Sequence, residues 1–167
     1  MMRNSKTIVL GIMLMLGASG ISAQAWSGEF VLAEGDFTVG IDFPTLTLTQ
    51  IDENCLLEVE GVVTFTGTLE GIASARTRAL TSASCVDVAS FPPGAFEDVF
   101  TSKLEFAGTI DGHPIVADFT YRGETEIGGA IEAVFIGSDG LRGRLSVDAI
   151  VAVGGSYKGL LRVPGHW

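Results

Sequence analysis

The chain has 167 residues with 20 acidic and 10 basic side chains, and 47% of its residues are hydrophobic. Nucleic acids and anionic lipids are bound largely through lysine and arginine, so this acidic balance excludes a surface dedicated to phosphate backbones. Solubility explains the charge, which by itself indicates no partner.

The N-terminal residues contain the three regions of a secretory signal peptide in their usual order. Arg3 and Lys6 precede an uncharged apolar run at residues 7–16, and small residues follow up to Ala23-Gln24-Ala25, which is typical of a cleavage site. The apolar run is too short for a transmembrane helix, which needs roughly 20 residues. The pattern therefore predicts a cleaved signal peptide over residues 1–25 and no membrane span.

The mature chain, residues 26–167, has the size of one ordinary domain, and we expect it in the periplasm or outside the cell. Its two cysteines, Cys55 and Cys85, are predicted to form a disulfide, because oxidising compartments favour one. A bridge that closes a loop of roughly 30 residues stabilises a fold by about 3–4 kcal/mol on the chain-entropy model. Two cysteines and two distant histidines do not have metal-ligand spacing, so neither a metal nor another cofactor is predicted.

Alternation of apolar and polar residues with period two recurs along the mature chain, which is typical of half-buried strands. The odd positions of residues 57–69 are apolar or glycine and the even positions are mainly polar, while residues 100–110 have their apolar face at even positions. The same reasoning predicts strands at residues 28–34, 37–43, 46–52, 57–69, 72–81, 100–110, 113–122, 129–137, 145–153 and 157–163.

The chief irregular segment is residues 86–98. Its adjacent Pro92 and Pro93 cannot donate to a strand ladder and predict a loop. The 22 glycines of the chain serve as turn residues and as places where a closing sheet bends. Together these features predict a single all-β domain, an antiparallel β-barrel of about eight strands, with a sandwich as the alternative.

An internal repeat indicates two hairpins. Residues 65–71 (FTGTLEG) match residues 106–112 (FAGTIDG), and each copy ends in an acidic residue followed by glycine. Asp-Gly favours a two-residue turn. In the second hairpin such a turn pairs Phe106 with Ala117, so that apolar residues face each other.

Two registers are open for the first hairpin. A three-residue turn centred on Glu70 sets Cys55 opposite Cys85 and points Arg76 and Arg78 outward. A two-residue turn, by analogy with the repeat, slips the partner by one residue and points both arginines inward. The first register is preferred, because it brings the cysteines together without burying charge.

Residues 100–163 resemble the C-terminal part of the allene oxide cyclase-like barrel group. The similar motifs are FAGTIDG (106–112), GSDGLRG (137–143) and GSYKGLLRV (155–163), and residues 56–81 are similar to the preceding hairpin of that group. The resemblance is nearest to small bacterial members without an assigned activity, and it implies a compact antiparallel barrel with an apolar interior. Relatives include cyclases of fatty-acid derivatives, spirocycle-forming enzymes and exported dirigent proteins, but their active residues do not align with this chain, so no activity is carried over.

No catalytic constellation stands out in the sequence. His113 lies beside a turn without a neighbouring nucleophile, and a solvated surface position is the preferred interpretation. An acid or base inside the barrel would have to come from Asp118, Glu132, Arg76 or Arg78. Outward placement of the two acidic residues is the preferred interpretation, and no catalytic residue is predicted.

Aromatic residues on the interior faces suggest a binding site. We predict that Phe65, Phe106, Phe119 and Tyr121 line a pocket for a small lipophilic ligand, because small residues on the same faces leave room beside them. A fully packed core fits the same pattern. The predicted function is an exported barrel that binds such a ligand. The alternatives are a cyclase or isomerase acting on an apolar substrate, and a structural or interaction protein that presents its acidic face or residues 91–96.

Overall fold

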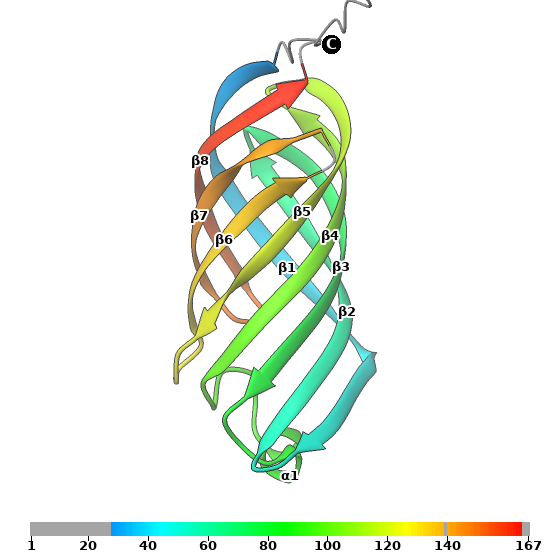
Figure 1. Cartoon of the computed structure of the whole chain (residues 1–167), viewed down its shortest axis with the longest axis vertical. Helices are drawn as coiled ribbons and strands as arrows, with labels where there is room; N and C mark the ends of the chain where they lie inside the picture. Colours follow the sequence, from blue (N-terminus) through cyan, green and yellow to red (C-terminus); the bar gives the residue numbers. More distant parts are fainter. Residues whose placement is uncertain (1–27, 139, 165–167) are drawn as a thin grey trace, which may run out of the picture.

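The structure is a computed structural model that describes residues 28–138 and 140–164. Within these residues eight antiparallel strands follow one another around a single sheet, which closes between the last strand and the first (Figure 1). The predicted signal peptide, residues 1–25, lies outside the described residues. The elements are β1 (Gly28–Ile51), β2 (Asn54–Gly67), β3 (Leu69–Thr81), α1 (Cys85–Ser90), β4 (Asp98–Ile110), β5 (His113–Thr125), β6 (Ala130–Ser138), β7 (Arg142–Ile150) and β8 (Gly154–Pro164).

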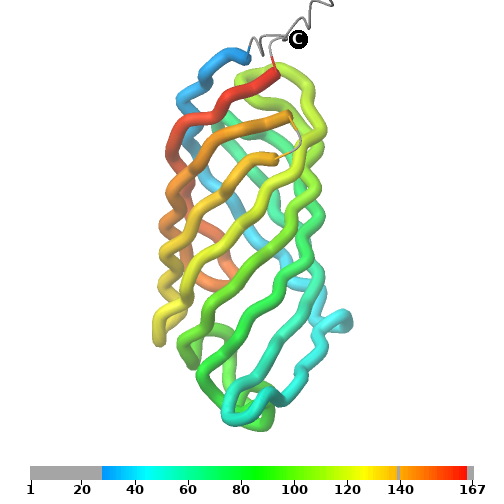
Figure 2. The backbone as a smooth tube through the Cα atoms, viewed as in Figure 1, coloured from blue at the N-terminus to red at the C-terminus, as the bar shows by residue number. Residues whose placement is uncertain are grey.

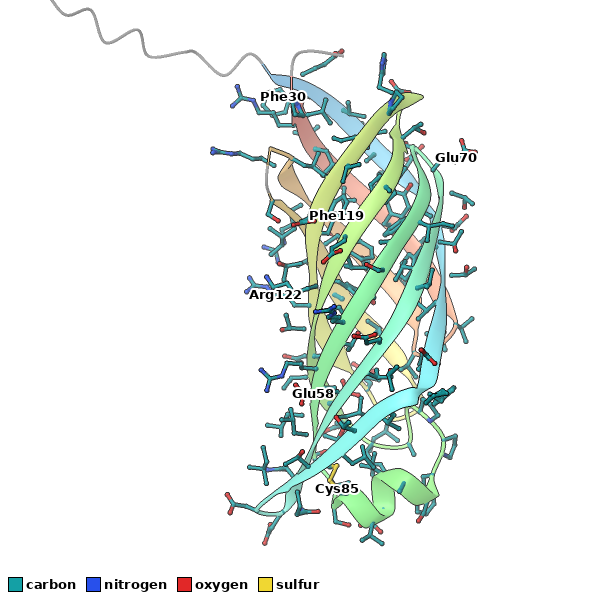
Figure 3. The ribbon with its side chains drawn as sticks, turned by 90° about the vertical axis from the view of Figure 1, so that its right-hand side faces the viewer. Phe30, Glu58, Glu70, Cys85, Phe119 and Arg122 are labelled. Atoms are coloured by element: carbon teal, nitrogen blue, oxygen red, sulfur yellow. A yellow bond between two sulfur atoms is a disulfide. The ribbon has the colours of Figure 1, made fainter. Side chains whose placement is uncertain are left out.

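Alternate side chains of the strands point into the barrel, which confirms the predicted all-β antiparallel barrel. Phe65 of β2 and Phe106 of β4 are at most 1% exposed. Figure 3 shows Phe119 of β5 within the barrel and Arg122, three residues further along the same strand, pointing away from it. The inner face therefore follows the period of two that the sequence contains.

β1 is one long strand, which corrects the prediction of three separate strands within residues 28–52. It pairs with β2 along most of its length, with a register shift between Asp42 and Thr47. Pro44, which has no N–H to donate, lies in the shifted part. The ladder is interrupted there, but pairing with β2 resumes.

Gly35 lies in the gap between the strands predicted at residues 28–34 and 37–43. The structure shows no break there, and the need for glycine comes from close packing. A Cβ atom at this position would lie 2.1 Å from the Thr66 carbonyl oxygen and 2.6 Å from the Tyr157 hydroxyl. That hydroxyl accepts a hydrogen bond from the Leu69 N–H at 2.9 Å and donates one to the Thr66 oxygen at 3.0 Å. Tyr157 thus holds the β2–β3 turn from inside the barrel, and β1 needs glycine to leave room for its ring.

The β2–β3 hairpin has neither of the two predicted registers. Phe65 pairs with Gly71 rather than with Ala75. The chain turns around Thr68, whose N–H donates to the Glu34 carbonyl oxygen at 3.0 Å and whose hydroxyl oxygen accepts from the Glu34 N–H at 3.1 Å. Bonding to β1 therefore fixes the turn earlier in the chain than the acidic-glycine signal indicated.

The observed register differs from the preferred one by an even number of residues, so the two faces are unchanged. Arg76 and Arg78 point outward, as the preferred register predicted, and form ion pairs with Glu60 at 3.3 Å and Glu58 at 2.8 Å. Exposed pairs of this kind contribute little to stability. The predicted register of the second hairpin is confirmed, since Phe106 of β4 pairs with Ala117 of β5.

The lower end of the barrel in Figure 1 is covered by residues 85–97, which we call the floor segment. It consists of α1, which was not predicted, and the loop that follows. The Ser84 side chain caps the helix by accepting a hydrogen bond from the Asp87 N–H at 3.2 Å. At the other end of the segment, the Gly94 carbonyl oxygen accepts from the Gly128 N–H at 2.9 Å.

Cys55 and Cys85 form a disulfide, as predicted, with their Cα atoms 4.8 Å apart. The bridge does not join two opposed strand positions, because Cys55 lies opposite Thr81. It fastens the start of α1 to β2 (Figure 3). The disulfide therefore holds the floor segment against the barrel.

The strands differ in length, and this leaves one side of the barrel short. In Figure 2 the tube coloured cyan and green, from β1 to β4, reaches further down than the part coloured yellow to red, from β6 to β8. Pairing of β1 with β8 ends at Thr38 and Gly154. Beyond this pair, β1 is bonded to β2 alone among the described strands.

Candidate ligand-binding site

The upper part of the interior is filled with aromatic rings. The Phe65 ring centroid lies 5.6 Å from that of Phe106, 6.4 Å from Phe119 and 5.4 Å from Phe135. These distances are typical of packed aromatic pairs. Three of the four residues predicted to bind a ligand, Phe65, Phe106 and Phe119, therefore pack against one another and do not border the cavity described next.

The lower part of the interior contains a cavity of about 120 Å³. On this part of the inner wall β3 places only small side chains, Ala75, Thr77 and Ala79. The rings of Phe100 on β4 and Tyr121 on β5 border the space without filling it. Tyr121, the fourth predicted residue, thus does line a cavity.

The cavity is partly open to solvent. Its lining includes the exposed residues Gly40 on β1 and Ile150 at the end of β7. These residues lie where β1 continues past the end of its pairing with β8, and the Val39 N–H donates to the Val153 carbonyl oxygen at 3.0 Å beside them. The short side of the barrel therefore provides the entrance.

Asp98 brings a carboxyl group to the cavity wall. Its Oδ1 accepts a hydrogen bond from the Thr125 hydroxyl at 3.0 Å. Burial raises the pKa of this carboxyl from 3.8 to about 6, because desolvation disfavours the charged form and the Thr125 hydrogen bond offsets only part of that effect. Asp98 therefore changes charge close to neutral pH.

Tyr121 adds a hydroxyl group to the same wall. The side chain is 7% exposed, and within the described residues its hydroxyl has no hydrogen-bond partner. Burial raises the pKa of this phenol. The nearby Thr77 and Ser102 hydroxyls are hydrogen-bonded to each other. Since buried polar groups are nearly always bonded, the unbonded Tyr121 hydroxyl is an unusual feature of this part of the interior.

The cavity lining includes two acidic side chains, Asp98 and Glu60, and no lysine, arginine or histidine among the described residues. Glu60 is at the outer rim and pairs with Arg76. Thr81 and Thr125, which lie opposite Asp98 on β3 and β5, carry no charge. The partners of Asp98 on both neighbouring strands are therefore neutral.

Further acidic residues lie close to Asp98 along the chain and on β5. Glu97 precedes Asp98, and Glu124 and Glu126 flank its partner Thr125. All three are exposed. Their charges are screened by solvent, so burial remains the main influence on Asp98.

The other polar candidates from the sequence do not reach the cavity. Glu132, Arg76 and Arg78 are exposed, and Asp118 lies between the inward-facing Ala117 and Phe119 and so on the outer face of β5. None of them belongs to the cavity lining, and the outward interpretation of both acidic residues agrees with the structure. His113, at the start of β5, is exposed.

Asp98 was missed because the sequence placed it at the end of the irregular segment 86–98. Two signals identify it. The inward face at even positions of residues 100–110 extends back to position 98, and the predicted register of the second hairpin sets Asp98 opposite Thr125, as the structure has it. Because the irregular segment runs directly into β4, the first inward-facing residue of that strand was assigned to the loop.

Comparisons with known proteins give no assignment, since no family model, no curated protein and no solved structure matches the chain. In the part of the chain that the structure describes, no helix has the length and apolar character that a membrane span requires. The same residues contain no group of three or more His, Cys, Asp or Glu side chains placed to hold a metal ion. The geometry of the cavity is therefore the main guide to function.

The two interior tyrosines provide a matched pair of substitutions. Tyr157→Phe leaves the buried Leu69 N–H without its acceptor and should lower the free energy of unfolding by about 1–3 kcal/mol. Tyr121→Phe removes a hydroxyl that has no partner and should change it by less than about 0.5 kcal/mol, or raise it. Urea unfolding of both variants measures the difference, and an equal or larger loss at Tyr121 would contradict the assigned bonding.

Asp98 makes stability depend on pH. Because folding raises its pKa, the folded protein binds more protons than the unfolded chain between pH 3.8 and about 6. The stability linked to this group is fully present below pH 3.8 and is lost as pH rises through about 6. Asp98→Asn keeps an acceptor for Thr125 and does not titrate, so the variant should gain stability relative to wild type as pH rises through this range. Urea unfolding at several pH values tests this, and a difference that stays constant with pH would refute it.

Proposed function

We propose that this protein is an exported barrel that binds one small, mainly apolar molecule in the lower cavity. A single observation carries the proposal: a barrel with a packed upper half has an accessible cavity below it, bordered by small side chains of β3 and by the rings of Phe100 and Tyr121. Native cores rarely leave such a space unfilled. A bound molecule would fill it.

The volume limits the size of the molecule. Pockets for drug-sized ligands usually have roughly 300–1,000 Å³, whereas this cavity has about 120 Å³. An engineered apolar cavity of about 150 Å³ binds benzene or xenon. The proposed ligand therefore places at most about one ring in the cavity, and a longer substituent or an acyl chain would have to extend out of the entrance.

Export is part of the proposal and has two supports. Residues 1–25 have the pattern of a signal peptide. The disulfide between Cys55 and Cys85 fits an oxidising compartment. The ligand would then be met in the periplasm or outside the cell.

An enzyme of the cyclase or isomerase type is the second candidate, and Asp98 favours it. A carboxyl with a pKa of about 6 can donate or accept a proton near neutral pH. The binding experiment below tests the cavity on which both functions depend, since toluene, its probe, has no group to cyclise or isomerise.

Filling the cavity should abolish binding. Ala79→Leu adds side-chain volume at the cavity wall, and Ala107→Leu adds the same volume on the exposed outer face of β4 as the matched control. With toluene as probe, ligand-observed NMR titration should give wild-type affinity for the control and an affinity at least about tenfold lower for Ala79→Leu, equivalent to 1.4 kcal/mol.

Overpacking can destabilise a core, so thermal unfolding of both variants should accompany the titration. If Ala79→Leu does not fold, Ala79→Val serves as the milder replacement. Equal toluene affinity in all folded variants, or no toluene binding by wild type, would refute the proposed function.

A further inference from the structure

Asp98 gives the cavity a charge that nothing within it compensates. The residues that line the cavity include no lysine, arginine or histidine in the described part of the chain. The only side-chain hydrogen bond to the carboxyl among these residues comes from Thr125 at 3.0 Å, which is a neutral donor. An ionised carboxylate removed from water costs free energy unless a partner of opposite charge is provided.

At neutral pH this carboxylate is largely ionised. With a pKa of about 6, the charged form predominates at pH 7. Only a positively charged group would compensate this form fully. The missing partner is therefore better supplied by a cation than by a neutral molecule.

Aromatic rings stand around the same space. The Tyr121 centroid lies 4.9 Å from that of Phe100 and 6.1 Å from that of Phe37, and all three residues belong to the cavity lining. Ring faces attract organic cations within about 6 Å by their quadrupole and also pack against apolar groups. The wall therefore suits a molecule that combines a cationic nitrogen with an apolar body.

The net charge of the chain favours the same ligand. The chain carries a formal net charge of −10, which attracts cations toward the entrance. Glu60 at the rim is paired with Arg76, so the carboxylate inside the cavity is the one that needs a partner.

We infer that the ligand of this cavity is a small organic amine whose protonated nitrogen is bound by the carboxylate of Asp98, with its apolar body against the rings of Phe37, Phe100 and Tyr121. This inference rests on the proposed function and specifies its ligand class. The size of the cavity limits the body to about one ring, since a comparable engineered cavity holds benzene.

Benzylamine tests the inference, with benzyl alcohol as a neutral molecule of the same shape and toluene as the apolar reference. At pH 7.5 wild type should bind benzylamine at least about tenfold more tightly than benzyl alcohol, because hydrogen bonds between charged groups are stronger than neutral ones. Asp98→Asn should remove this preference and retain the affinity for benzyl alcohol. Isothermal titration calorimetry of the full mature chain, with its disulfide intact, measures all three probes.

Glu60→Gln is the matched control, since it removes a carboxylate at the rim and leaves the one inside. It should keep the preference for benzylamine. If Glu60→Gln abolishes the preference as completely as Asp98→Asn does, or if Asp98→Asn keeps it, then surface attraction explains the binding and the inference is wrong.

If Asp98→Asn does not fold, a pH titration of wild type tests the same point. The preference for benzylamine should fall as pH is lowered through about 6, because Asp98 becomes protonated. Two kinds of titratable group lie near Asp98. The raised pKa of Tyr121 keeps its phenol neutral over this pH range. The carboxylates of the second kind are exposed to solvent, and they belong to Glu60, Glu97, Glu124 and Glu126. A preference that does not change over this range would overturn the inference, provided that toluene affinity is constant.

The two proposals fail in different ways. If toluene and benzyl alcohol bind but benzylamine is not preferred, the amine inference falls and the proposed binding function stands. If none of the three probes binds to wild type, both fall.

Discussion

Closure of the sheet through β1 is the constraint on which the rest of the structure depends. At residues 35–38 this strand pairs with β2 on one side and with β8 on the other. Closure removes the free edges that an open sheet would leave there and gives each pleated strand one face inside the barrel and one in solvent. The close approach of Gly35 to Thr66 and Tyr157 shows how tightly the join is packed. Every second residue of each strand must then fill the interior, and the sizes of those residues decide where space remains.

Side-chain size divides the interior into a filled half and a half with space. Above, phenylalanine rings from β2, β4, β5 and β6 contact one another and complete the core. Below, β3 contributes only alanine and threonine, and the short strands β6 to β8 leave an entrance beside β1. The polar groups Asp98 and Tyr121 lie in this lower half, with the floor segment fastened beneath by the disulfide. The filled half can thus keep the barrel stable while the lower half leaves the space in which we propose that a ligand binds.

The sequence was sufficient for features that depend on local alternation and insufficient for those that depend on three-dimensional packing. The faces of most strands and the pairing of Phe106 with Ala117 follow from a period of two. The direction of Arg76 and Arg78 was open between two registers, and the outward one, which the structure has, was preferred partly because it buries no charge. The turn around Thr68 did not, because its position is set by hydrogen bonds to β1, which is distant in sequence. The cavity itself depends on how much space neighbouring strands leave between them, and Asp98 became recognisable only once its strand was known to begin there.

A crystal structure determined under pressurised xenon tests the central claim most directly, because xenon enters apolar cavities without needing a polar contact. The account predicts a xenon atom between β3 and the rings of Phe100 and Tyr121, and none among Phe65, Phe106 and Phe119. A barrel that takes up no xenon below, or that holds it between the upper phenylalanines, would contradict this division of the interior, on which the proposed site and the proposed ligand depend.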